Sequence, residues 1–136
     1  MSAGRRVNTL SHEWCTPAKY VSVVRNFFGG EIDLDPCSNN SSIVKATIEY
    51  KLPEKDGLKE SWNFQKIYVN PPYGADRERG TTIKNWLAKC FLANQDYKSE
   101  VIALIITQKP QIVNLRFKCL KIILLRLGVC VIRSES

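Results

Sequence analysis

The sequence predicts an α/β domain with a parallel sheet. Segments with apolar residues at helical spacing alternate along the chain with short apolar segments of strand type. Residues 101–106 form a continuous apolar run, which is typical of a strand buried on both faces of a parallel sheet. Because ligands bind beyond the carboxyl ends of the strands in such sheets, polar residues near those ends become candidate site residues. Three of them are Asp35, Asp56 and Asn70.

The amino-terminal segment predicts a flexible arm followed by a helix. Residues 1–11 are polar and basic and form the arm. The helix is expected to start with Thr16 as N-cap and Pro17 in the first helical position, and to end at the glycine pair 29–30. Its apolar positions are Tyr20, Val23, Val24, Phe27 and Phe28.

Two strands of different clarity follow. Residues 31–36 predict a short strand, which Pro36 is expected to end. Residues 43–50 have weak periodicity and fit a short helix and a second strand, before a mostly irregular segment at 51–62. Residues 66–70 form a clear strand that two prolines end.

The next helix is expected after a polar loop at residues 73–80. Thr81 or Thr82 supplies the N-cap. The helix has an apolar face, because its apolar residues recur at helical spacing. They are Ile83, Trp86, Leu87, Cys90 and Phe91.

Composition limits the classes of protein and site. The chain of 136 residues fits one domain, and its net charge of +7 favours a polyanionic partner such as nucleic acid, or else a merely soluble basic protein. The five cysteines form no CxxC pair and His12 is the sole histidine, so we expect neither a disulfide framework nor a metal site. The first residues lack the apolar core of a signal peptide and the apolar runs are too short to cross a bilayer. We therefore expect a cytoplasmic protein of a bacterial host or phage-infected cell, with no membrane partner.

The segment Asn70-Pro71-Pro72-Tyr73 carries the clearest chemical signal. Methylation of an exocyclic amine requires acceptors for both amine hydrogens, so that the nitrogen lone pair can turn toward the methyl donor. The Asn70 side-chain oxygen and the Pro71 carbonyl can provide them, and two prolines fix their spacing. Tyr73 offers a flat face for a flipped-out base. The alternative is a rigid turn with a packed tyrosine.

Four motifs in order resemble the phage-type DNA N6-adenine methyltransferases, a Dam-like family. They are Glu13-Trp14-Cys15-Thr16-Pro17, Ile32-Asp33-Leu34-Asp35-Pro36-Cys37, Asp56-Gly57-Leu58 with Trp62, and Asn70-Pro71-Pro72-Tyr73-Gly74. The resemblance covers roughly residues 12–106. It implies a Rossmann-like sheet that binds S-adenosylmethionine, a methyltransferase core over residues 12–107, and adenine N6 in DNA as the methyl acceptor.

The resemblance also implies a cofactor site. It assigns the methionine end of S-adenosylmethionine to Trp14, Thr16 and Pro17, where the alternative is a plain N-cap beside a buried tryptophan. The resemblance assigns contacts with the cofactor ammonium or ribose hydroxyls to the carboxylates of Asp33 and Asp35, with Pro36 opening the loop of this cofactor site, where the alternative is a solvated turn. The cofactor adenine falls to Asp56 and Leu58, where the alternative is a surface turn. The chain departs from many methyltransferases because it has no glycine-rich loop.

Double-stranded DNA with a flipped adenine is the expected partner. Arg77, Arg79 and Lys84 follow the Asn-Pro-Pro-Tyr segment and could reach phosphates of the DNA strand whose base is flipped, although a solvated charged loop is the simpler explanation for any one of them. Two other functions stay open: a defective remnant that binds DNA or cofactor only, and a protein glutamine methyltransferase.

The resemblance stops before the last segment of the chain. Residues 108–136 form an atypical basic tail with Glu135 as their one acid. We expect that this tail is translated out of frame or marks a truncated gene, which would leave the C-terminal strands of the sheet incomplete. The alternative is a smaller variant in which the tail forms a helix and an edge strand.

Overall fold

A mixed sheet of five strands forms the centre of the fold. The computed structural model describes residues 16–72, 80 and 82–104, and the backbone of 129–132. The strand order is β2-β1-β3-β4-β5, and the first four strands are parallel while β5 runs antiparallel to β4. The strands are β1 (Leu34–Ser38), β2 (Ile48–Lys51), β3 (Lys66–Val69), β4 (Glu100–Leu104) and β5 (Val129–Ile132). The predicted α/β class with a parallel sheet is confirmed for β1 to β4.

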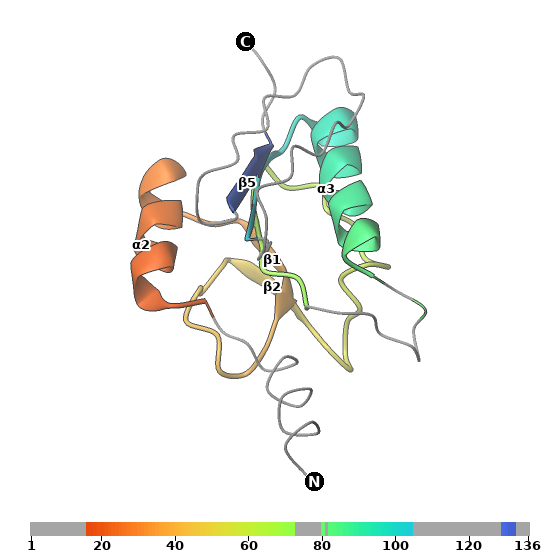
Figure 1. The fold of residues 1–136 in the computed structure, drawn as a ribbon, viewed down its shortest axis with the longest axis horizontal. Helices are drawn as coiled ribbons and strands as arrows, with labels where there is room; N and C mark the ends of the chain where they lie inside the picture. The colour runs from red at the N-terminus through yellow and green to blue at the C-terminus, as the bar shows by residue number, and fades with distance from the viewer. Residues whose placement is uncertain (1–15, 73–79, 81, 105–128, 133–136) are drawn as a thin grey trace, which may run out of the picture.

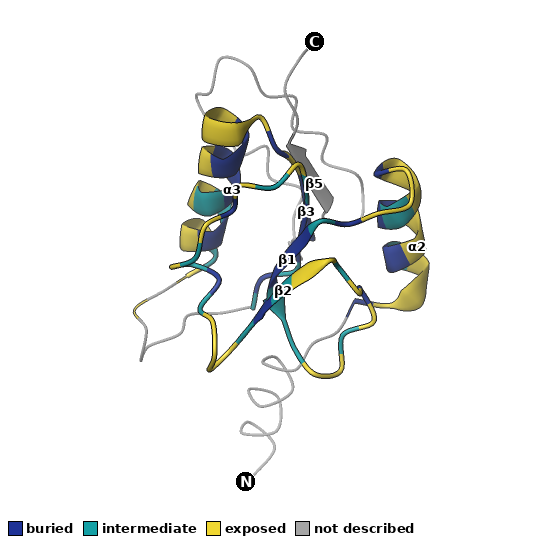
Figure 2. Cartoon of the chain, turned by 180° about the vertical axis from the view of Figure 1, so that it is seen from behind, coloured by how far each residue is buried: buried dark blue, intermediate teal, exposed yellow. Residues whose placement is uncertain are grey.

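One helix covers each face of the sheet (Figure 1). Helix α2 (Ala18–Phe27) lies on one face and helix α3 (Ile83–Tyr97) on the other. Side chains of successive strand residues point to opposite faces, and β3 and β4 accordingly contribute to the apolar layers on both faces. Figure 2 shows α3 with its buried residues toward the sheet and its exposed residues outward.

The layer under α3 is apolar and contains the large aromatic residues. We call it the α3-face core. Trp62 and Trp86 pack with their ring centroids 6.3 Å apart, and the indole N–H of Trp62 donates to the Gly57 carbonyl over 2.7 Å. The buried members are Leu34, Tyr50, Trp62, Ile67, Val69, Trp86, Cys90, Phe91, Ala93, Val101 and Ala103.

The layer under α2 is the α2-face core. Its buried members are Val21, Val24, Phe28, Ile32, Val44, Tyr68, Ile102 and Leu104. Val24 and Phe28 confirm two predicted apolar positions of the helix, whereas Val23 and Phe27 are 63% and 42% exposed. Val21 takes a place in the core that the expected spacing did not assign.

The ends of both helices follow local sequence. Thr82 caps α3 because its hydroxyl accepts from the Lys84 N–H while its own N–H donates to the Asn85 side chain. Gly29 and Gly30 end α2 with positive φ angles of 79° and 108°, which a glycine adopts without steric cost. Both helix-end predictions are confirmed, with Thr82 as the cap.

Two predictions about local structure are wrong. Thr16 does not cap α2: the N-cap is Pro17, without a side-chain hydrogen bond, and the helix begins at Ala18. Pro36 does not end the first strand, because β1 continues to Ser38. The register with β2 is irregular between Asp35 and Ser38, and such an irregularity accommodates a residue that lacks an N–H.

Strand β5 lies within the predicted atypical tail. It pairs with β4 over four residues, from Val101↔Ile132 to Leu104↔Val129. An edge strand agrees with the alternative in which the tail belongs to a smaller variant of the fold. The expectation that the tail is translated out of frame or marks a truncated gene stays a prediction. In the part of the chain that the structure describes, no helix is long and apolar enough to cross a membrane.

Candidate active site

The carboxyl ends of β1 and β3 bring predicted site residues together. Leu34 pairs with Ile67 in parallel register, so three residues later Cys37 lies level with Asn70. The Cys37 thiol donates to the Asn70 carbonyl over 2.9 Å. Pro71, directly after Asn70, is fully buried. The backbone of Asn70 is therefore restrained by the hydrogen bond from Cys37 and by the buried Pro71 that follows it.

The side chain of Asn70 is joined to the start of α2. Its amide nitrogen donates to the Thr16 hydroxyl over 3.0 Å. The same hydroxyl lies 2.5 Å from the Tyr68 hydroxyl. Thr16 and Tyr68 are 5% and 2% exposed, so the hydrogen bond between their hydroxyls is shielded from water, whereas the one from Asn70 to Thr16 is partly buried. Asn70 directly follows β3 and lies two residues after Tyr68, so the alternation of the strand directs both side chains toward the α2 side.

Asp35 is a buried carboxyl group at the same end of the sheet. It is 2% exposed, and its side chain accepts from the Cys37 N–H over 3.2 Å. The pKa of Asp35 is raised to about 7, mainly by burial and to a smaller extent by the Glu49 carboxylate, while the hydrogen bond from the Cys37 N–H acts in the opposite direction. Asp35 is therefore close to half-protonated at neutral pH, and a cationic or hydrogen-donating ligand would favour its ionised form.

The thiol of Cys37 stays protonated beside this carboxyl group. Burial raises the pKa of Cys37 well above its ordinary value, and the nearby Asp35 carboxylate adds to the effect. A protonated thiol can donate to the Asn70 carbonyl, whereas a thiolate cannot. Cys37 is accordingly a structural support of the turn and a poor nucleophile.

The loop after β2 is held against the end of β1. The Asp56 side chain accepts from the Leu58 N–H over 3.0 Å and so closes a tight turn. A Cβ on Gly57 would lie 1.8 Å from the Pro36 carbonyl oxygen, so only glycine fits this close approach. Asp56 and Leu58 are thereby placed beside Pro36, which directly follows Asp35.

Asp33 lies at the other end of the strand. It precedes β1, and its side chain accepts from the Lys66 N–H at the start of β3 over 2.9 Å. The structure does not bring Asp33 together with Asp35 and Asn70. This position favours a structural contribution of Asp33 to strand pairing over the predicted contact with a cofactor, which stays untested.

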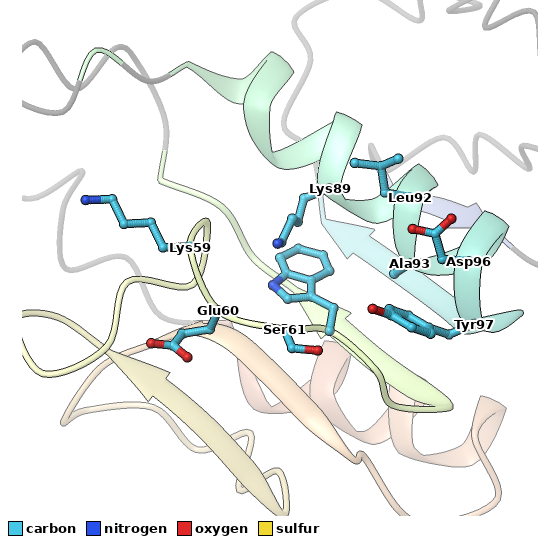
Figure 3. Close-up of a pocket in the computed structure, with 9 residues that line it drawn as sticks. Lys59, Glu60, Ser61, Lys89, Leu92, Ala93, Asp96 and Tyr97 are labelled. Atoms are coloured by element: carbon cyan, nitrogen blue, oxygen red, sulfur yellow. The ribbon is translucent and has the colours of Figure 1, made fainter.

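A separate hollow lies on the α3 side (Figure 3). Its volume is about 280 Å³. The Lys89 ammonium lies 6.0 Å from the centre of the Trp62 ring there. The lining residues are Lys59, Glu60, Ser61, Trp62, Lys89, Leu92, Ala93, Asp96 and Tyr97. None of them is a predicted site residue, so this hollow is not part of the candidate active site.

Some predicted residues lie outside the described part of the chain. These are Trp14, Tyr73, Arg77 and Arg79. Of the predicted DNA contacts Lys84 is described, and it is exposed in the first turn of α3. Among the described residues, no group of three or more His, Cys, Asp or Glu side chains could hold a metal ion.

Tyr68 and Cys37 were missed as site residues in the sequence. Tyr68 reads as one more apolar residue of a strand, and Cys37 as the start of a polar turn. A signal for Tyr68 exists, since it lies two residues before Asn70 and must share its face of the sheet. No pattern in the sequence indicates that Tyr68 contacts Thr16, because the two residues are 52 positions apart in the chain.

One known protein family matches most of the chain. The family model described as DNA N-6-adenine-methyltransferase (Dam) matches residues 5–113. No curated protein and no solved structure matches the chain. The matched range contains all the predicted site residues, and it reaches the first residues of the basic tail.

Proposed function

The chain belongs to the DNA N-6-adenine-methyltransferase (Dam) family, and on that premise we propose that it transfers a methyl group from S-adenosylmethionine to N6 of adenine in double-stranded DNA. The observation that carries the proposal is the restraint of Asn70. Its amide nitrogen is bound by Thr16 and its carbonyl by Cys37, at the carboxyl end of β3. Four parallel strands in the order β2-β1-β3-β4 support a Rossmann-like methyltransferase sheet.

The target amine sets the chemical demand on this turn. The lone pair of the adenine amine is delocalised into the ring, so the nitrogen is a poor nucleophile. In the proposed reaction the Asn70 side-chain oxygen accepts a hydrogen bond from one N–H of the adenine amine, and the Pro71 carbonyl accepts a hydrogen bond from the other. Both acceptors are fixed before the base arrives, so little reorganisation opposes the reaction. Tyr73 would stack on the flipped base, and Arg77, Arg79 and Lys84 would bind phosphates of its strand.

The donor and acceptor set at the end of β1 fits the cofactor. Asp35 is buried at this end, and the Asp56–Leu58 turn packs beside Pro36. Asp35 would accept hydrogen bonds from ammonium or ribose hydroxyl groups, and Asp56 from the adenine amine. S-adenosylmethionine, when bound, supplies an electrophilic methyl group. Trp14 and Pro17 would complete the pocket near the methionine end, whereas Thr16 contributes through its hydrogen bond to Asn70.

One assay tests the reaction. The full chain is incubated with unmethylated duplex DNA and methyl-labelled S-adenosylmethionine, in parallel with Asn70→Ala and with Asn63→Ala as a matched control at an exposed asparagine. We expect label in N6-methyladenine, lost by roughly a hundredfold or more in Asn70→Ala and retained in Asn63→Ala.

Three other outcomes contradict the proposal. Binding of DNA or cofactor without transfer would indicate a defective remnant. Label in protein glutamine would assign a different substrate. Equal activity of Asn70→Ala and Asn63→Ala would remove Asn70 from the reaction.

A further inference from the structure

We infer that Tyr68 is a positioning residue: it accepts the single hydroxyl proton of Thr16 and thereby fixes which end of the Asn70 amide faces the target base. The inference rests on the proposed function, because it explains how the acceptor of that reaction is oriented. Tyr68 acts through Thr16 and does not itself touch the substrate.

The orientation of the Asn70 amide is a chemical choice between two states. Its oxygen and nitrogen ends are similar in size, and rotation about the terminal bond exchanges them. With the nitrogen toward Thr16, the oxygen lies on the opposite side of the amide and can accept from an adenine amine. With the oxygen toward Thr16, the nitrogen would meet the amine, and two donors would then face each other.

A count of protons on Thr16 selects one of these states. The hydroxyl has one proton and two lone pairs. When it donates its proton to the Tyr68 oxygen, 2.5 Å away, it can offer only a lone pair to Asn70. Asn70 must then present its amide nitrogen, which is the arrangement observed at 3.0 Å. Without the Tyr68 oxygen, the Thr16 proton could turn to the Asn70 oxygen and stabilise the flipped amide.

The surroundings fix the position of the Tyr68 oxygen beside Thr16. Its ring belongs to the α2-face core with Val21, Val24 and Ile102, and the side chain is 2% exposed. Thr16 is 5% exposed, immediately before the Pro17 cap of α2. Water therefore competes poorly for the Thr16 proton, and the hydrogen bond between the two hydroxyls is expected to persist.

Four substitutions separate this role from a general effect on folding. Tyr68→Phe removes the oxygen and keeps the packed ring. Tyr50→Phe is the matched control, because Tyr50 is also buried and donates over 2.7 Å to the Ser61 carbonyl in the α3-face core. Thr16→Val removes the hydroxyl from the other end, and Thr16→Ser retains it without altering Tyr68.

Steady-state kinetics give the first readout. We expect kcat of Tyr68→Phe to fall roughly 10- to 100-fold, with KM for DNA and cofactor within about twofold of the parent chain, because the acceptor is misoriented while binding surfaces persist. Tyr50→Phe should keep the parent kcat, and Thr16→Ser should exceed Thr16→Val by about tenfold or more.

Hydrogen exchange of the Asn70 side-chain amide gives a second readout that needs no turnover. Its NMR signals are identified by their loss in Asn70→Asp. We expect exchange about tenfold faster in Tyr68→Phe and in Thr16→Val than in the parent chain, and unchanged exchange in Tyr50→Phe.

The two readouts distinguish the inference from the proposed function. Parent-like kcat and parent-like amide exchange in Tyr68→Phe would overturn the inference while the methyltransferase function stands. A parent chain that methylates nothing would overturn the proposed function, and the amide exchange would still decide whether Tyr68 orients Asn70. If Tyr68→Phe does not fold, the Thr16→Ser and Thr16→Val pair still tests the link through which Tyr68 would act, and equal kcat and equal amide exchange in these two variants would overturn the inference.

Discussion

The two faces of the sheet differ in what they bury. The α3 face encloses Trp62, Trp86 and Phe91 in an almost wholly apolar layer. The α2 side has fewer buried apolar residues, and the polar groups near it are Thr16, Asp35 and the Tyr68 hydroxyl. Asn94 and Ser99 are buried at the end of α3, where the Asn94 amide donates to the Ser99 carbonyl over 2.8 Å. Burying polar groups costs free energy unless they are hydrogen-bonded, whereas burying apolar surface stabilises the fold. The difference indicates that the larger apolar layer, on the α3 face, contributes most to stability, whereas the polar residues of the candidate site lie on the α2 side.

Strand alternation produces this division within single strands. In β3, Ile67 and Val69 point to the α3-face core, whereas Tyr68 lies in the α2-face core and Asn70 contacts Thr16. In β1, Leu34 lies in the α3-face core and Asp35 follows it. A shift of register by one residue would exchange the two sets, so the strong apolar face also fixes the place of the site residues.

The largest expected effect on stability is the loss of Trp62. Trp62→Ala leaves a cavity in the α3-face core and leaves the Gly57 carbonyl without its indole donor. We expect the free energy of unfolding in urea to fall by about 3–5 kcal/mol, while the kcat per folded molecule remains close to that of the parent chain. Leu92→Ala, at a half-exposed position of α3, is the control and should change stability by less than about 0.5 kcal/mol. If Trp62→Ala lowers the free energy of unfolding only slightly, the conclusion that the α3-face core contributes most to stability is wrong.

Asp35→Asn is expected to raise the free energy of unfolding, in contrast to Trp62→Ala, because the buried carboxylate of Asp35 destabilises the fold. Burial raises its pKa from 3.8 to about 7, so the folded chain binds a proton that the unfolded chain releases. The free energy of unfolding therefore falls as pH rises from about 4 to 7, and this loss is complete above the folded pKa. Asp35→Asn should be more stable than the parent at pH 8 by up to about 4 kcal/mol, and the advantage should shrink toward pH 5.

The measurement for Asp35 is urea unfolding at both pH values, with Asp96→Asn as a control for the same change of charge at an exposed acid. If Asp35→Asn raises the free energy of unfolding by the same amount at both pH values, ionisation of the buried Asp35 carboxyl group does not destabilise the fold. Loss of cofactor binding alongside a gain in stability would sharpen the comparison, since one residue would then oppose stability and serve function.

Gly57→Ala tests the contact between the two regions and has the smallest expected effect on stability. An added Cβ would meet the backbone of Pro36, so the 56–58 turn must move away from the end of β1. We expect a loss of about 1–3 kcal/mol in urea unfolding together with weaker cofactor binding in calorimetry. Unchanged stability would mean that the turn moves freely, and that the α3-side loop does not support the site.

Sequence pattern predicts the layers of this fold well, for a local reason. The apolar run at β4, the strand before Asn70 and the Thr82 cap of α3 depend on spacing within a few residues, and all three are confirmed. The second strand, β2 (Ile48–Lys51), falls near the predicted 43–50 because weak alternation gives only an approximate boundary.

The contacts that build the site are less accessible from sequence. Threonine before proline is a common helix start, and the same hydroxyl can equally bind a distant partner. Here the distant partners Tyr68 and Asn70 take it, so the local rule fails at Thr16. The sequence does not distinguish Asp33 from Asp35, because both are aspartates. The register of β1 with β3 distinguishes them: it places Asp33 beside Lys66 at the start of β3, and Asp35 nearer the end that is followed by Asn70.

The hydrogen bonds of Thr16 also link the orientation of Asn70 to the completion of folding. They join residues that are 52 and 54 positions apart, across a segment that includes β1, β2 and most of β3. Closing so long a loop costs entropy that only the assembled sheet and its packed helix can offset. A partly folded chain would hold the Asn-Pro-Pro segment without its oriented acceptor. The orientation of Asn70 thus depends on the long-range order of the domain, and on the proposed function a nascent chain would be inactive until that order is complete.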